Sequence, residues 1–237
     1  ILTDAAERGM ERDAAIEAVA LIALSQLVDA ERALAWGHSH VVSWRGQDYK
    51  VTWWSPDGQV DLNAAPPAIL SAAFRAANAE RPDRLASAVI DWRDLDDLDS
   101  VNGAEAGEYV RANLPLPANR PFEHEAELSR VLGVSEALAA CMRAYVTVSS
   151  WREAPVAELA PVRLRDALAM AGNPLEPAGL TILNEAGTLI GLRIEAQDDV
   201  TGALVHELRL RLSGQSTNPL LVQAVDTVGP VMCEREG

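Results

Sequence analysis

The residues best suited to chemistry in this sequence are carboxylates gathered in one short stretch. Five aspartates occur within nine residues, and two glutamates follow them. These carboxylates are Asp91, Asp94, Asp96, Asp97, Asp99, Glu105 and Glu108. Carboxylates so close together repel one another unless a cation or arginines compensate, and Ca²⁺ takes six to eight oxygen ligands from such loops. The stretch predicts a calcium-binding loop, and a solvated acidic turn is the alternative.

The spacing of these carboxylates follows an EF-hand loop only in part. With Asp94 as position one, Asp96 is position three and Glu105 is position twelve. Leu98 then replaces the oxygen ligand of position five, and Asp99 replaces the glycine of position six. We therefore expect a calcium loop of another type.

Sequence signals for an enzyme are weak. The chain contains no G-x-S-x-G, P-loop, G-x-G-x-x-G or H-E-x-x-H motif. His38 and His40 have no third metal ligand nearby in the sequence, and Cys141 and Cys233 lack the close spacing of a zinc pair. The cysteines are compatible with a disulfide and equally with two buried thiols. We expect a protein that is not an enzyme.

The charge balance argues against nucleic acid as the main partner. Acidic residues outnumber basic ones 35 to 20, for a formal net charge of −15, whereas nucleic-acid binders concentrate positive charge. The runs Val60–Leu70 and Leu128–Val134 are nevertheless similar to helix-hairpin-helix units, and in the first run Asn63 is expected to cap the following helix. A helix-hairpin-helix nucleic-acid-binding protein, or another scaffold protein, is therefore the alternative function.

A long helix is predicted at the N-terminus, over residues 2–35, by the helical spacing of its apolar residues. A stalk that enters a head domain and an ordinary amphipathic core helix both fit this pattern. We expect the apolar stripe to bind partner helices through Ile16, Val19, Ala20, Leu24 and Leu27. No segment reaches the roughly 20 apolar residues that span a bilayer. The chain also begins at Ile1, which suggests that a preceding segment is missing.

The remaining pattern predicts an α+β fold, in which the long helix packs on an antiparallel sheet and a large all-helical domain is inserted. Expected domain limits are 1–62, 63–145 and 146–237. Strands are expected at 41–44, 49–55, 59–62, 145–150, 189–196, 203–212 and 220–226. The turn Arg45-Gly46-Gln47-Asp48 is expected to join the first two strands in a hairpin. Helices are expected at 67–78, 84–92, 104–111, 123–133, 135–142 and 161–171.

Several of these runs occur in an order that resembles a known family, the K-subunit minor pseudopilins (GspK) of bacterial type II secretion. The runs are Val60–Leu70, Asp91-Trp92-Arg93-Asp94, Gly103-Ala104-Glu105 with Tyr109, Asn119-Arg120-Pro121-Phe122, Glu127-Leu128, Val131-Leu132-Gly133 and Thr147-Val148. One departure is Glu158-Leu159-Ala160-Pro161, which stands where the family often repeats an Asn-Thr-Ala-Pro signature.

The resemblance implies a pseudopilin fold interrupted by a helical domain. It implies a periplasmic head whose full-length form is anchored in the inner membrane by a helix absent here. It implies a place at the pseudopilus tip with I- and J-type minor pseudopilins, a role in assembly and protein export, and contact with secreted substrate. It also implies Ca²⁺ in the acidic loop, with Asp94, Asp96, Asp97 and Glu105 as the ligands.

Overall fold

The computed structural model describes residues 2–29, 39–96, 98, 102–157, 159–173, 175, 189–198, 202–212 and 220–228. The chain forms two compact units. The sheet unit consists of Ile1–Ser55 and Leu180–Pro230, and the helical unit consists of Pro56–Gly179 and Val231–Gly237. Among the described residues, no helix is long and apolar enough to cross a membrane.

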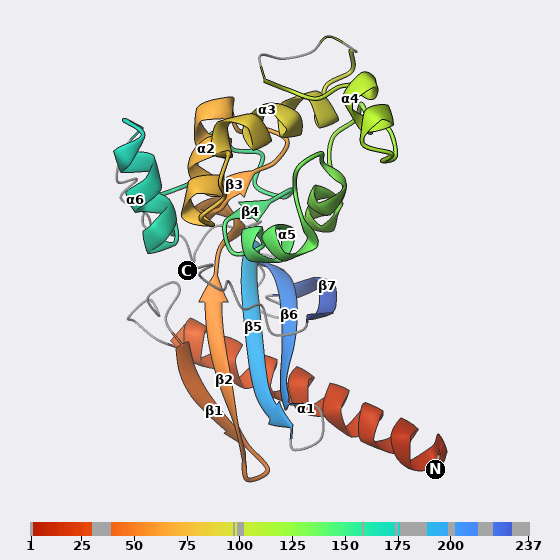
Figure 1. The fold of residues 1–237 in the computed structure, drawn as a ribbon. Coiled ribbons are helices and arrows are strands. Elements are labelled where there is room, and N and C mark those ends of the chain that lie inside the picture. The colour runs from red at the N-terminus through yellow and green to blue at the C-terminus, as the bar shows by residue number, and fades with distance from the viewer. Residues whose placement is uncertain are drawn as a thin grey trace. The chain divides into compact units, whose positions relative to one another are not determined.

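The sheet unit contains one long helix and a five-stranded sheet, with strand order β1-β2-β5-β6-β7 (Figure 1). Every pair of neighbouring strands is antiparallel. The elements are α1 (Leu2–Asp29), β1 (Ser39–Trp44), β2 (Gln47–Trp54), β5 (Leu189–Asp198), β6 (Gly202–Leu212) and β7 (Leu220–Val228). The predicted combination of a long helix and an antiparallel sheet is confirmed.

The β1–β2 hairpin turns through two residues with positive φ, Arg45 at 49° and Gly46 at 83°. Two successive left-handed residues form the turn type whose twist matches that of the flanking strands. The predicted hairpin is therefore present, but its turn is Arg45-Gly46 alone, because Gln47 already pairs with Trp44. The turn fixes the pairing of Val42 with Tyr49.

Helix α1 packs its apolar stripe against its own sheet. Ile16, Val19, Ala20 and Leu24 are buried in one cluster with strand residues, which include Val42, Val51, Trp53, Ile190, Leu192 and Ile194. These four side chains are therefore unavailable to a partner helix, which corrects the expectation that they form a partner surface. The side chain of Leu27, the fifth residue of that expectation, lies outside the described residues.

The helical unit surrounds a second core, in which Leu62, Leu70, Phe74, Leu128 and Leu164 are fully buried. Its helices are α2 (Pro67–Ala76), α3 (Pro82–Arg93), α4 (Ala106–Arg111), α5 (Glu136–Met142) and α6 (Val162–Met170), with 3₁₀ turns η1 (Pro56–Gly58) and η2 (Glu125–Arg130). Its strands are β3 (Val60–Asp61) and β4 (Val146–Thr147).

The helical unit also contains the parallel pair β3 and β4, which lies just outside the expected limits 63–145 of the inserted helical domain. The short strands expected near residues 60 and 146 therefore pair with each other and are absent from the five-stranded sheet. The run from Val60 begins as a strand, and its helical part starts only at Pro67. Between η2 and α5, the chain turns at Gly133, whose φ is +89°.

Candidate metal centre

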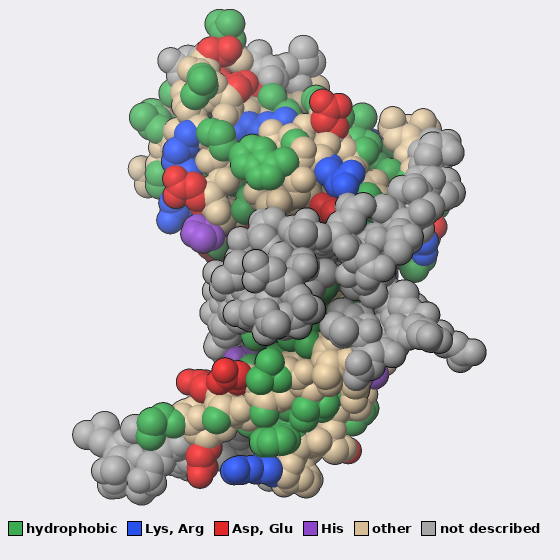
Figure 2. Space-filling model, turned by 180° about the vertical axis from the view of Figure 1, so that it is seen from behind, with side chains coloured by type: hydrophobic (Ala, Val, Ile, Leu, Met, Phe, Trp, Pro, Cys, Tyr) green, Lys and Arg blue, Asp and Glu red, His purple; other side chains and the backbone are tan. Residues whose placement is uncertain are grey.

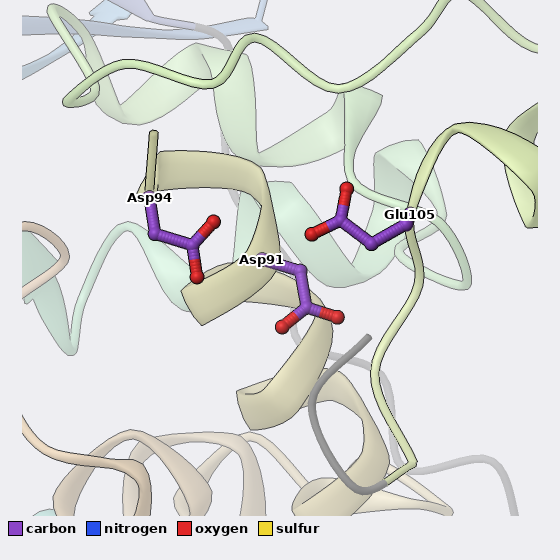
Figure 3. Close-up of side chains that lie close together, drawn as sticks. All are labelled: Asp91, Asp94 and Glu105. Carbon is purple, nitrogen blue, oxygen red and sulfur yellow. The ribbon is translucent and has the colours of Figure 1, made fainter. Parts of the chain in front are cut away.

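Three carboxylates of the helical unit converge at the point where α3 ends and α4 begins (Figure 3). Asp91 lies in the last turn of α3, Asp94 follows that helix directly, and Glu105 is the N-cap residue of α4. One oxygen from each lies within 4.8 Å of the other two. Asp91 and Glu105 are buried, and Asp94 is partly exposed.

The electrostatics of this group disfavour three bare negative charges. Burial raises the pKa of Asp94, and the negative charges of Asp96 and Asp91 raise it further, whereas the neighbouring Arg93 lowers it. The Oδ1 atom of Asp94 is buried and accepts no hydrogen bond from the described residues. A cation between the three carboxylates would relieve both the repulsion and the lack of a partner.

The chain closes over Asp91 through a glycine. The Asp91 Oδ2 atom accepts a hydrogen bond of 2.7 Å from the amide of Ala104. A Cβ atom on Gly103 would lie 1.8 Å from the same oxygen. Only glycine therefore lets the backbone come this close without displacing the carboxylate.

The structure brings together two of the four predicted ligands, Asp94 and Glu105. Asp96 does not belong to the group of three carboxylates. Its Oδ1 atom instead accepts a hydrogen bond from the amide of Leu98. Asp97 lies outside the described residues. Asp91 was missed, although its spacing of three residues from Asp94 places both on one face of a helical turn.

The donor set of this centre suits a hard cation. Carboxylate oxygens are ligands that Ca²⁺ prefers, and carbonyl groups and water complete its shell of six to eight. Neither sulfur nor imidazole contributes to the group, so its chemistry does not resemble that of a zinc centre. Asp91, Asp94 and Glu105 are the residues that would hold Ca²⁺.

Aromatic side chains form the apolar support beside the centre. The Trp92 ring lies 6.0 Å from the rings of both Tyr109 and Phe122. The Tyr109 hydroxyl accepts a hydrogen bond from the amide of Leu132. Burial raises the pKa of Tyr109 to about 12, and the charges of Asp91 and Glu105 add to this effect. The helices that carry Asp91 and Glu105 are therefore packed into the core through Trp92 and Tyr109.

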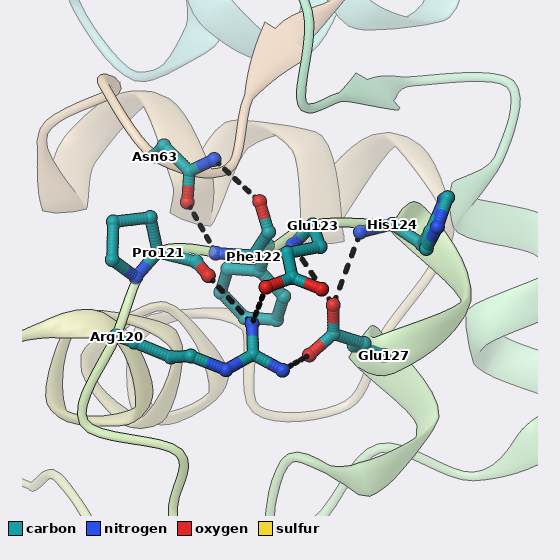
Figure 4. A network of polar contacts seen from close by, with 7 residues as sticks. All are labelled: Asn63, Arg120, Pro121, Phe122, Glu123, His124 and Glu127. Atoms are coloured by element: carbon teal, nitrogen blue, oxygen red, sulfur yellow. Dashed lines mark hydrogen bonds and ion pairs between the residues drawn. The ribbon is translucent and has the colours of Figure 1, made fainter.

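Asn63 links the start of the helical unit to the segment before η2 (Figure 4). Its Oδ1 atom accepts from the Phe122 amide at 2.7 Å, and its Nδ2 atom donates to the Phe122 carbonyl at 2.9 Å. The N-cap residue of α2 is Pro66, without a side-chain cap. The expectation that Asn63 caps this helix is therefore wrong, because its amide pairs with a distant backbone.

Glu127 holds the same segment in a polar network (Figure 4). Its Oε1 atom accepts from the amides of Glu123 and His124, and its Oε2 atom accepts from Arg120 at 3.0 Å. Burial by itself raises the pKa of Glu127, but the two amides and the Arg120 charge outweigh it and lower the pKa. The ionised form of Glu127 therefore stabilises the fold.

Asp61 is a second buried carboxylate with many partners. Its Oδ1 atom accepts from the amides of Asn63 and Ala64, and its Oδ2 atom accepts from the amides of Ser150 and Trp151 and from the Ser150 hydroxyl. It therefore joins the chain after β3 to the chain after β4.

Residues 55–150 match the family described as "Type II secretion system (T2SS), protein K". No protein of curated function matched. One similar solved chain comes from "The Crystal Structure of the GspK-GspI-GspJ complex from enterotoxigenic Escherichia coli Type 2 Secretion System". That likeness has 17% identity and a TM-score of 0.64, and it covers 96% of this chain and 98% of the other. At 17% identity, this likeness shows a shared fold and nothing about function.

Proposed function

We propose that this chain, whose residues 55–150 match the protein K family of the type II secretion system, is the periplasmic head of a minor pseudopilin at the pseudopilus tip. Its role is to assist pseudopilus assembly and protein export, and it is structural rather than catalytic. The family match carries this proposal. The likeness to a chain of the GspK-GspI-GspJ complex over 96% of the sequence supports it.

Cys141 is disulfide-bonded, which supports a location in an oxidising compartment. Disulfides persist in the bacterial periplasm and are rare in the cytosol. Cys233 is the other cysteine of the sequence and lies outside the described residues. We infer that the head lies in the periplasm and that the full-length protein is anchored in the inner membrane.

The partners that we propose are I- and J-type minor pseudopilins, contacted through the exposed face of α1. Met10, Ala14 and Leu21 are exposed, and Ala18 between them is partly exposed. Their spacing of three or four residues places them on one face of the helix. This face differs from the stripe that α1 buries against its sheet.

Ca²⁺ is the cofactor that we propose for Asp91, Asp94 and Glu105. The bound ion would neutralise the converging carboxylates and fix the connection between α3 and α4. Its role would therefore be structural. The absence of sulfur and imidazole ligands from the group supports a hard cation.

The test of the partner proposal is binding to the heads of the I- and J-type pseudopilins of the same secretion system. Leu21→Glu charges a side chain that is 57% exposed, so it should abolish binding and leave the melting temperature unchanged. Leu24→Glu is the matched variant at a side chain that is 5% exposed. It should lower the melting temperature, because it buries a charge in the core. Undiminished binding by folded Leu21→Glu would refute the proposed face.

A further inference from the structure

Trp151 of the helical unit has an exposed indole on an unfavourable backbone. The residue is 71% exposed, and its φ is +55°. A positive φ is a true outlier for a bulky residue, whereas glycine and asparagine adopt it more easily. Neither core packing nor local backbone preference therefore accounts for a tryptophan here.

The unfavourable conformation is held in place by Asp61. The Asp61 Oδ2 atom accepts from the Trp151 amide at 2.8 Å and from the Ser150 amide at 3.0 Å. Asp61 is fully buried, and its other oxygen accepts two further amides. Strained residues that the surrounding structure fixes so firmly are concentrated at functional sites. The buried carboxylate therefore fixes the backbone from which the indole projects.

The next residue, Arg152, is an exposed cation with donors to spare. Its Nε atom lies 3.3 Å from the Asp57 Oδ1 atom, and its side chain is half exposed. A guanidinium group has five N–H donors, and no hydrogen bond from Arg152 to another described residue is present. Tryptophan and arginine are enriched among the residues that dominate binding energy at protein interfaces.

On the face of the helical unit drawn in Figure 2, the exposed hydrophobic side chains lie in separate patches among charged residues. A partner would therefore bind through one exposed side chain, such as the Trp151 indole, and not through a broad apolar surface. The chemistry of Trp151 and Arg152 fits a partner that offers an aliphatic side chain to the indole and a carboxylate to the guanidinium group.

The net charge of −15 opposes docking on an anionic membrane, because like charges repel. A permanent protein partner would also cover the indole continuously, which a transient one would not. We propose that Trp151, with Arg152 beside it, is an anchor for the I- and J-type pseudopilin pair in the assembled tip. This inference rests on the proposed function and adds a second contact, separate from α1.

The experiment measures binding of the mixed I- and J-type heads to the wild-type chain and to variants. Trp151→Asn and Trp151→Gly suit the left-handed backbone, so their melting temperatures should not fall below that of the wild type. Their affinities should fall at least about tenfold. Met170→Ala, at a helical residue that is 87% exposed, is the control and should bind like the wild type. Arg152→Gln should weaken binding and reduce its dependence on salt.

Wild-type affinity in both Trp151 variants would overturn the inference and leave the proposed function standing. Lower melting temperatures in both would overturn it too, because the indole would then be packing on its own unit. Binding to phosphatidylglycerol vesicles, or self-association, that is lost in Trp151→Asn would reassign the anchor and so overturn it. No binding by the wild-type chain would reject the proposed function itself.

Discussion

The carboxylate group at the α3–α4 junction predicts a calcium response that depends on Asp91 and not on Asp96. Asp91→Asn removes one charge and keeps an oxygen that accepts from Ala104. Two unit charges within 4.8 Å of each other repel by at least about 3 kcal/mol at an effective dielectric constant of 20. In EGTA, Asp91→Asn should therefore be as stable as the wild type or more stable.

The magnitude of the calcium effect follows from mass action. At a Ca²⁺ concentration of 100 times the dissociation constant, binding stabilises the folded state by about 2.7 kcal/mol. For a chain of this length, that corresponds to a rise in melting temperature of about 5–10 °C. The rise should be lost in Asp91→Asn and kept in Asp96→Asn, whose carboxylate accepts only from the exposed loop.

The assay is calorimetric unfolding in Ca²⁺ and in EGTA, with Mg²⁺ at the same concentration as the control for ionic strength. A pH series adds a second test, because the folded-state pKa of Asp94 is raised. The folded state then binds the proton more tightly than the unfolded state. In EGTA, the free energy of unfolding should therefore increase as the pH falls through the raised pKa of Asp94. The rise in melting temperature caused by Ca²⁺ should become smaller over the same range, because protonation removes the charge that binds the ion. A response lost in Asp96→Asn and kept in Asp91→Asn would refute the reasoning, as would a wild type that does not respond.

Two further predictions concern Gly103, which lies against Asp91, and Glu127, which holds the segment before η2. Gly103→Ala should displace the Asp91 carboxylate, because its Cβ atom would lie 1.8 Å from Oδ2. It should lower stability by about 1–3 kcal/mol and weaken Ca²⁺ binding in calorimetric titration, and an unchanged titration would contradict the close approach. Glu127 has a lowered folded-state pKa, so its contribution is present above the unfolded-state pKa of about 4.3 and is lost as the pH falls through the lowered value. Glu127→Gln should therefore be less stable than the wild type at pH 7, and urea unfolding should show the gap narrowing below about pH 4. A gap that does not change with pH would mean that the charge is unimportant.

The resemblance based on ordered motifs was confirmed by the family match over residues 55–150. The amino-acid sequence of those motifs did not reveal the structural role of each residue. Asn63 was predicted to cap a helix, yet it pairs with the backbone of Phe122, 59 residues away. A short polar side chain can bond to local or distant backbone with similar chemistry, so the sequence did not distinguish the two.

The sequence by itself determined the elements with strong local signals. Helical periodicity identified α1 and the face that it buries, and Arg45-Gly46 identified the β1–β2 hairpin, because both depend on neighbouring residues. The density of carboxylates identified the region in which the candidate metal ligands lie. Only the tertiary structure decided that the α1 stripe packs on its own sheet, that β3 pairs with β4, and that Asp91 joins Asp94 and Glu105. The physical reason is that periodicity specifies a buried face but not what covers it, and that ligands converge only after segments distant in sequence have packed.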